Sequence, residues 1–360
     1  VCSSDLTLMK AWPGSISIAS ACRASVARTG EERSSASRRS SSRRLRSTRL
    51  AASSTPSSWL ARLALHSGCD PLTLTGAIWP KWRVWSVDTD RGLTASRAMS
   101  AAMWFGCEPD AVHATTLQEL ADRLAGRAAR SRPVLPWILA LGSRNRQHYA
   151  GLPCCPQCLA DDPEPFFRRA WRLAFVVGCE VHGTRLIDRC PDCHALIAPH
   201  LCISKLQNLA RCSACGQDMR RYVPPSAEVD ALDFQGRAMA VLVAGEGLWD
   251  HGTVSGIEWF RRMRSMLVPS RCTVVRADMQ EPALRPNDLL LEMQSPRERE
   301  ARLCCLAAIL RADALPKPRC ATQSSTGGSA KGKAGESLLP VAKELVQADW
   351  ERWLRRNRLW

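Results

Sequence analysis

Four pairs of metal-ligating residues between positions 151 and 222 constrain this chain more than any other feature. Each pair has two residues between its members. Such a gap lets a tight turn aim two ligand atoms at one ion, and a tetrahedral structural zinc needs two such turns. We therefore predict two structural Zn²⁺ sites, one of three cysteines and a histidine and one of four cysteines. The eight predicted ligands are Cys155, Cys158, Cys179, His182, Cys190, Cys193, Cys212 and Cys215.

The order of the pairs leaves two ways to combine them. Adjacent pairing places the first two pairs in one site and the last two in the other, whereas interleaved pairing joins the first pair to the third. The long intervals after the first and third pairs suit two successive ribbon-like modules, so adjacent pairing is favoured. An iron–sulfur cluster is the alternative for the all-cysteine set, but the regular pairs and the neighbouring histidine favour zinc.

Further cysteines and histidines lie beside these pairs. Cys154 with Cys158 would have three intervening residues and break the two-residue rule, so we interpret Cys154 as a spare thiol. We interpret His194, His200 and Cys202 as bystanders. Because each ligand set is then complete, no coordination position stays open for a reacting water, and we expect a structural rather than a catalytic role.

Length, charge and cysteine content set the broad class. The chain has 360 residues, 17 of them cysteine, and a formal net charge of +16. This length predicts two or three domains. The N-terminus lacks the pattern of a secretory signal, and no apolar run is long enough to span a membrane. We therefore expect a reducing, cytoplasmic location for the cysteines, and an anionic partner such as nucleic acid.

Residues 1–56 are anomalous in composition. They are rich in Ser, Arg and Ala, and residues 1–58 hold ten Lys and Arg against three Asp and Glu. One interpretation is a disordered basic leader that touches phosphates. The other, which we favour, is that the segment is not native protein, because VCSSDL is also the translation of GTGTGCTCTTCCGATCT, the end of a common sequencing adapter.

Residues 57–150 are expected to form an N-terminal helical region that resembles a helix-turn-helix. Ser57 or Ser58 is a candidate cap for a first helix, Gly68 ends that helix and Pro71 begins a second. The phrase GCDP at 68–71 returns as GCEP at 106–109, each between two short apolar helices. This outline fits a DNA-reading helix-turn-helix or plain helical packing, and plain packing is favoured.

Three tryptophans, Trp79, Trp82 and Trp85, recur at spacing three in this region. On one helix they would form a stripe, which is more typical of a core than of a nucleotide-stacking platform. Further along, Arg168, Arg169 and Arg172 interrupt a dense apolar cluster. We interpret them either as contacts to nucleic acid or an acidic partner, or as a solvated basic face.

The whole pattern predicts a mainly α fold with small zinc-ribbon β elements. The tandem zinc-binding modules occupy residues 151–222, and a C-terminal helical region occupies 223–315. Residues 316–339 are expected to be a polar linker. Residues 340–360 are expected to form an amphipathic helix, whose apolar side comprises Val341, Leu345, Val346, Trp350, Trp353 and Leu354.

The cysteine-rich segment resembles the TniQ family of transposition proteins. The shared phrase is CPxCL followed by acidic residues, an Arg/aromatic stretch, CxxHG, a Leu-containing strand and CPxC, which here begins at Cys155 and ends at Cys193. SSWLARLA at 57–64 and TTLQEL at 115–120 are also similar to that family's N-terminal part. The resemblance covers residues 57–222 well. Two residues depart from the family pattern. Members usually have another residue at the position of Cys154, and a glycine is common at the position of His194.

The resemblance implies a role in choosing where a transposon inserts. Such proteins recognise the insertion site through DNA or through a site-bound complex, and they recruit an ATP-hydrolysing regulator and a transposase. Relatives act at attachment sites, at resolvase recombination sites or as adapters on RNA-guided complexes, and a homodimer is compatible with this role. A bacterial, nucleoid-associated location follows.

The sequence leaves two alternative functions. A transcription regulator with helix-turn-helix and zinc-ribbon modules is the alternative that uses the same elements. The second alternative is an enzyme, but the sequence has no phosphate-binding P-loop, no HExxH and no nucleophile elbow. We therefore expect no enzymatic activity and no catalytic residues.

Overall fold

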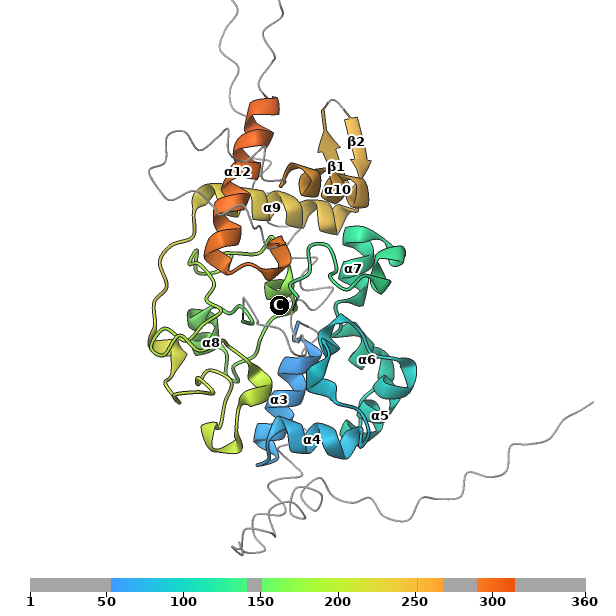
Figure 1. The fold of residues 1–360 in the computed structure, drawn as a ribbon, viewed down its shortest axis with the longest axis vertical. Coiled ribbons are helices and arrows are strands. Elements are labelled where there is room, and N and C mark those ends of the chain that lie inside the picture. The colour runs from blue at the N-terminus through green and yellow to red at the C-terminus, as the bar shows by residue number, and fades with distance from the viewer. Residues whose placement is uncertain (1–52, 141–150, 251, 268–289, 315–360) are drawn as a thin grey trace, which may run out of the picture.

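The structure, a computed structural model, describes residues 53–140, 151–250, 252–267 and 290–314. This part is mostly helical, with one small two-stranded sheet and two cysteine clusters, which confirms the predicted fold class (Figure 1). Among the described residues, no helix combines the length and hydropathy that crossing a membrane requires. The predicted linker at 316–339 and the predicted amphipathic helix at 340–360 lie outside the described residues.

Two short helical hairpins form the N-terminal region. The first joins α3 (Pro56–His66) to α4 (Pro71–Ile78), and the second joins α5 (Ala95–Phe105) to α6 (Pro109–Ala114). In each turn a glycine adopts a positive φ, +70° at Gly68 and +65° at Gly106, which glycine tolerates without strain. The repeated GC-D/E-P phrase therefore marks two similar turns, as the sequence predicts.

The first helix begins slightly earlier than predicted. Its cap is Thr55, whose side chain accepts a hydrogen bond from the Ser58 backbone, so the prediction of Ser57 or Ser58 as the cap is wrong. Ser53 and Ser54 are buried, and the Ser53 carbonyl accepts a hydrogen bond from the Arg169 backbone. Residues 53–56 therefore belong to the fold, although they fall inside the segment 1–56 that we interpreted as a foreign or disordered leader.

The three tryptophans do not share a helix. α4 ends at Ile78, and Trp85 lies in a separate 3₁₀ turn, η1 (Val84–Ser86), because Pro80 follows directly after Trp79. They nevertheless pack on a hydrophobic core built from α3 to α6. The core interpretation is therefore confirmed without the helical stripe.

The chain then crosses to the cysteine-rich region through α7 (Gln118–Ala125) and η3 (Arg127–Ser131), whereas η2 (Thr89–Arg91) lies between the two hairpins. Regular structure is sparse there: α8 (Pro156–Asp161) is followed by the 3₁₀ turns η4 (Arg169–Arg172), η5 (Pro199–Leu201), η6 (Ser204–Leu206) and η7 (Met219–Arg221). Isolated antiparallel bridges replace extended strands in this segment.

The C-terminal region is helical, as predicted, with one addition. It contains α9 (Val229–Ala244), α10 (Gly256–Met266), η9 (Leu291–Met293) and α12 (Pro296–Ala314). Between α9 and α10 lies an antiparallel hairpin of β1 (Glu246–Trp249) and β2 (Gly252–Ser255), which was not predicted.

One large core unites the segments that the sequence separates. It runs from Ala61 and the α7 leucines through Phe175 in the cysteine-rich region to Leu306 on α12. A second, smaller core belongs to the N-terminal hairpins alone. The cysteine-rich region is thus packed between the N-terminal and C-terminal helices rather than attached as an independent module.

Candidate metal centres

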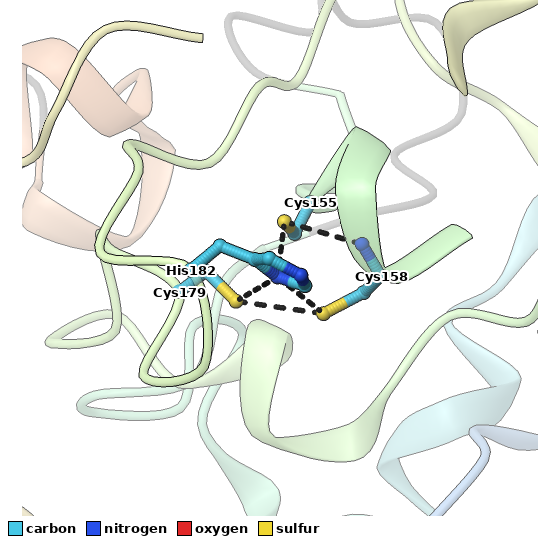
Figure 2. Close-up of side chains that lie close together, drawn as sticks. All are labelled: Cys155, Cys158, Cys179 and His182. Atoms are coloured by element: carbon cyan, nitrogen blue, oxygen red, sulfur yellow. Dashed lines mark hydrogen bonds between the residues drawn. The ribbon is translucent and has the colours of Figure 1, made fainter. Parts of the chain in front are cut away.

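The first cluster brings four side chains together from two separate turns. Cys155 and Cys158 come from the start of α8, and Cys179 and His182 come from a loop about 20 residues later. The histidine Nδ1 lies 3.6 Å from the Cys155 sulfur and 3.4 Å from each of the other two sulfurs. Figure 2 shows the three sulfurs and the imidazole turned toward one common point.

These separations fit a single tetrahedral zinc. With Zn–S bonds of about 2.3 Å, the edges of the tetrahedron are about 3.8 Å between sulfurs. The Cys158 and Cys179 sulfurs are 3.4 Å apart, and all four ligand atoms lie within 4.8 Å of one another. The three cysteines are buried, so water has little access to the sulfurs.

Local sequence explains the first turn. Cys155 is the N-cap of α8, and Pro156 occupies the first helical position, where its missing N–H costs nothing. The Cys158 backbone donates to the Cys155 sulfur at 3.5 Å. A backbone donor stabilises a thiolate, which is the form that binds metal. The contacts of Cys155 with the thiols of Cys158 and Cys179 further lower the pKa of Cys155, to about 2.

The other three turns share one backbone pattern. The first ligand donates its N–H to the carbonyl five residues on, and its carbonyl accepts from the N–H four residues on; the pattern begins at Cys179, Cys190 and Cys212. The residue four positions after the first ligand has a positive φ in each turn: +64° at Gly183, +58° at His194 and +76° at Gly216. His194 thus stands where the other two turns have glycine.

The second cluster assembles the last two pairs. The Cys190 sulfur lies 3.7 Å from that of Cys215, and the Cys193 sulfur lies 3.6 Å from that of Cys212. These are again tetrahedral edges for one zinc ion, and all four sulfur atoms lie within 4.8 Å of one another. Cys193 and Cys215 are exposed, so this cluster is open on one side where the first is closed.

The side chains group as adjacent pairing predicts, and each group could hold a metal ion. Cys154, the predicted spare thiol, and the three predicted bystanders stay outside both clusters. Cys154 is buried beside the first cluster, and burial raises the pKa of its thiol well above the usual range. His200 stacks on Trp85 with ring centroids 5.5 Å apart, and Cys202 is part of the main core.

One residue of the first cluster had no predicted role. The Oδ2 atom of Asp161 lies 2.9 Å from Nε2 of His182, on the side of the ring away from the sulfurs. A carboxylate in this position fixes the tautomer that leaves Nδ1 free to bind metal. The acidic residues after CPxCL are the sequence signal that could have identified it.

The prediction for the three arginines is wrong. Arg172 is fully buried and pairs with Asp88 and Asp90, with both N–O distances at 2.6 Å. Arg169 is also buried, and Arg168 pairs with Asp162 at 2.9 Å while lying over the rings of Phe166 and Trp171. Neither a phosphate-binding nor a solvated basic face is formed.

The comparison with protein families bears on the whole arrangement. The family model TniQ matches residues 45–186. This part of the chain, called the TniQ segment below, is similar to that family. It includes the N-terminal hairpins, α7 and all four residues of the first cluster, and it confirms the resemblance seen in the sequence. No curated protein matches the chain.

The limits of the TniQ segment are informative at both ends. It begins at residue 45, so the interpretation of 1–56 as foreign sequence does not hold for residues 45–56. It ends before Cys190, whereas the resemblance was expected to continue to residue 222. The first cluster therefore lies inside the TniQ segment, and the second cluster follows it.

Proposed function

We propose that this chain is a non-catalytic transposition accessory protein that selects the insertion target. It would bind the target DNA or a complex already bound there, and recruit an ATP-hydrolysing regulator and a transposase. The TniQ match over residues 45–186 carries the general part of this proposal, namely an accessory role in transposition. The choice of the insertion target and the identity of the recruited partners are the more specific part of the proposal.

The two cysteine clusters support a structural contribution to this role. Each offers four protein ligands, and a structural zinc bound there would supply folding energy to a segment with little regular structure. The eight predicted ligands are proposed to hold two Zn²⁺ ions. In the first site, Asp161 would orient His182, while the Cys158 backbone would stabilise the Cys155 thiolate.

The exposed faces of the helical hairpins argue against the transcription-regulator alternative. A helix that reads bases carries side chains such as Arg, Asn or Gln toward the groove. The second helix of the first hairpin, α4, instead exposes Leu72 and Gly76, and α6 exposes Asp110 and Ala114. Contact with the DNA backbone, or docking onto a site-bound complex, suits these helices better than direct base reading.

The proposed partners follow from the accessory role. They are the target DNA, directly or indirectly, the transposase and the ATP-dependent regulator, with a resolvase or an RNA-guided complex as the site-bound component. A homodimer would also be compatible. The proposed location is the bacterial cytoplasm, in association with the nucleoid.

A reconstituted transposition assay tests the proposal. Insertion frequency and insertion sites are mapped with the transposase and regulator in the presence and absence of this chain. We expect insertions to fall in number and to lose their preferred positions without it. Unchanged frequency and unchanged sites would refute the proposed function.

A further inference from the structure

We propose that the corner formed by α4, η1 and the N-terminus of α5 binds the phosphate backbone of duplex DNA through Lys81, Arg83 and Arg97. The inference rests on the proposed function, because it names the surface through which the chain would touch its target. It differs from the sequence-based expectation, which placed the basic contacts at residues 168–172, where the structure buries them.

The corner is unusual in its distribution of charge. Residues 71–87 and 91–107 contain no Asp or Glu. The two acids between these stretches, Asp88 and Asp90, point inward, with side chains 9% and 2% exposed, and both pair with Arg172. The negative charges of this region are therefore neutralised by Arg172 inside the protein, whereas its positive charges remain at the surface.

One cation of the corner, Arg97, is held against a tryptophan. The guanidinium carbon of Arg97 lies 3.8 Å from the ring centroid of Trp82, which stands between Lys81 and Arg83 in the chain. The Trp79 indole also donates a hydrogen bond to the Arg97 carbonyl at 3.3 Å. Stacking on Trp82 fixes the position of Arg97 without neutralising its charge. Lys81 and Arg83 are exposed.

Two other basic surfaces of the described chain carry their own acids. On α7 and η3, Arg123 pairs with Glu119, and Arg127 and Arg130 pair with Asp122. On α10, Arg261 and Arg262 both pair with Glu258. No acidic partner is found among the described residues for the three corner cations. A phosphate that approaches the corner therefore meets positive charge that is not already compensated.

The helix geometry adds donors to the same place. α5 begins at Ala95 after the cap Thr94, and residues 94–96 are exposed at this end. The first N–H groups of a helix and its dipole favour an anion. Figure 1 shows α4 and α5 together at the end of the molecule opposite α12. Because no base-reading side chains project from α4, the contact is to the backbone and independent of sequence.

The test measures binding of the full chain to a short duplex of arbitrary sequence, by fluorescence anisotropy at several salt concentrations. In K81A/R83A, two exposed side chains are removed, so the fold and the Trp82–Arg97 stack remain. We expect the affinity to fall by about tenfold or more, and the slope of log affinity against log salt to become shallower by about two. R97K keeps the charge and should retain most of the binding.

The matched control is R127A/R261A. It removes the same charge from side chains that are 87% and 70% exposed but already paired with acids. It should change affinity by no more than about twofold. Both doubles keep the basic residues of 1–58, so any contribution from that segment is the same in each. Circular dichroism and metal content confirm that the variants are folded.

Two results with the variants would overturn the inference: wild-type binding and an unchanged salt slope in K81A/R83A, or an equal loss in R127A/R261A. A chain that binds a site-bound protein complex but no DNA would also overturn it. The proposed function is judged separately by the transposition assay. If insertion depends on the chain but K81A/R83A binds DNA as wild type does, only this inference fails. If the corner binds DNA but insertion is unchanged without the chain, only the proposed function fails.

Discussion

The guanidinium of Arg172 lies 2.6 Å from a carboxylate oxygen of Asp90, and both side chains are almost completely buried. This pair joins the cysteine-rich region to the N-terminal hairpins, 82 residues apart in sequence. Asp90 also accepts hydrogen bonds from the backbone and hydroxyl of Ser57 on α3. The contact is therefore a structural junction, not a surface for a partner.

Removal of Arg172 should destabilise the whole fold. In Arg172→Leu, Asp88 and Asp90 would be left as buried carboxylates without a cation, which costs about 3–5 kcal/mol. Denaturant unfolding followed by tryptophan fluorescence measures this loss. Arg127→Ala, at an exposed position, should stay within about 0.5 kcal/mol of wild type. Equal stability of the two variants would show that the buried pair does not join these regions.

Asp161 should matter for metal retention rather than for stability of the core. In Asp161→Asn the negative partner of the His182 ring is lost, and we expect about a tenfold weaker hold on the metal at the first site. Competition with a chromogenic chelator measures this change. Asp110→Asn, an exposed carboxylate on α6, is the control and should retain metal as wild type does. An Asp161 variant that matches this control would remove the carboxylate from the site.

The adjacent cysteines should behave differently on substitution. Cys154 lies outside the first cluster, so Cys154→Ser should keep two zinc ions per chain. Cys155→Ser removes a proposed ligand and should keep only one, at the second site. Metal analysis of both purified variants decides between them. Loss of zinc from Cys154→Ser with retention in Cys155→Ser would reverse the assignment.

The turn at His194 should be improved by glycine. His194 has φ +58°, whereas the equivalent positions in the two similar turns are Gly183 and Gly216. His194→Gly should raise the free energy of unfolding by about 0.5–1 kcal/mol, because a Cβ is unfavourable in this conformation. Gly216→Ala, the reciprocal change, should lower it by about 1 kcal/mol. Thermal unfolding of the metal-loaded variants compares the two; a loss of stability in both would contradict the shared turn geometry.

The features predicted correctly are those written in local sequence. Two-residue ligand gaps define turns, so the eight side chains and their adjacent grouping could be read from spacing alone. A glycine followed closely by proline ends one helix and starts the next, which gave both N-terminal hairpins.

The features missed depend on distant partners or on short local signals. Arg172 was expected at a surface because arginine is seldom fully buried, and its partners Asp88 and Asp90 are far away in the chain. Asp161 acts through a histidine 21 residues later. The β1–β2 hairpin has only four residues in each strand, with Asp250 at φ +55° in its turn. Strands this short show too few alternations of apolar and polar residues to be recognised between two helices.

Bound metal in the folded, full-length chain is the most direct measure of the account. Two complete four-ligand clusters require two structural ions, so elemental analysis of purified protein should find about two zinc per chain. Their removal by a strong chelator should unfold the cysteine-rich region and weaken the core that it shares with both helical regions. A chain that holds no metal, yet melts cooperatively with the same helical content, would contradict the scaffold on which the proposed function rests.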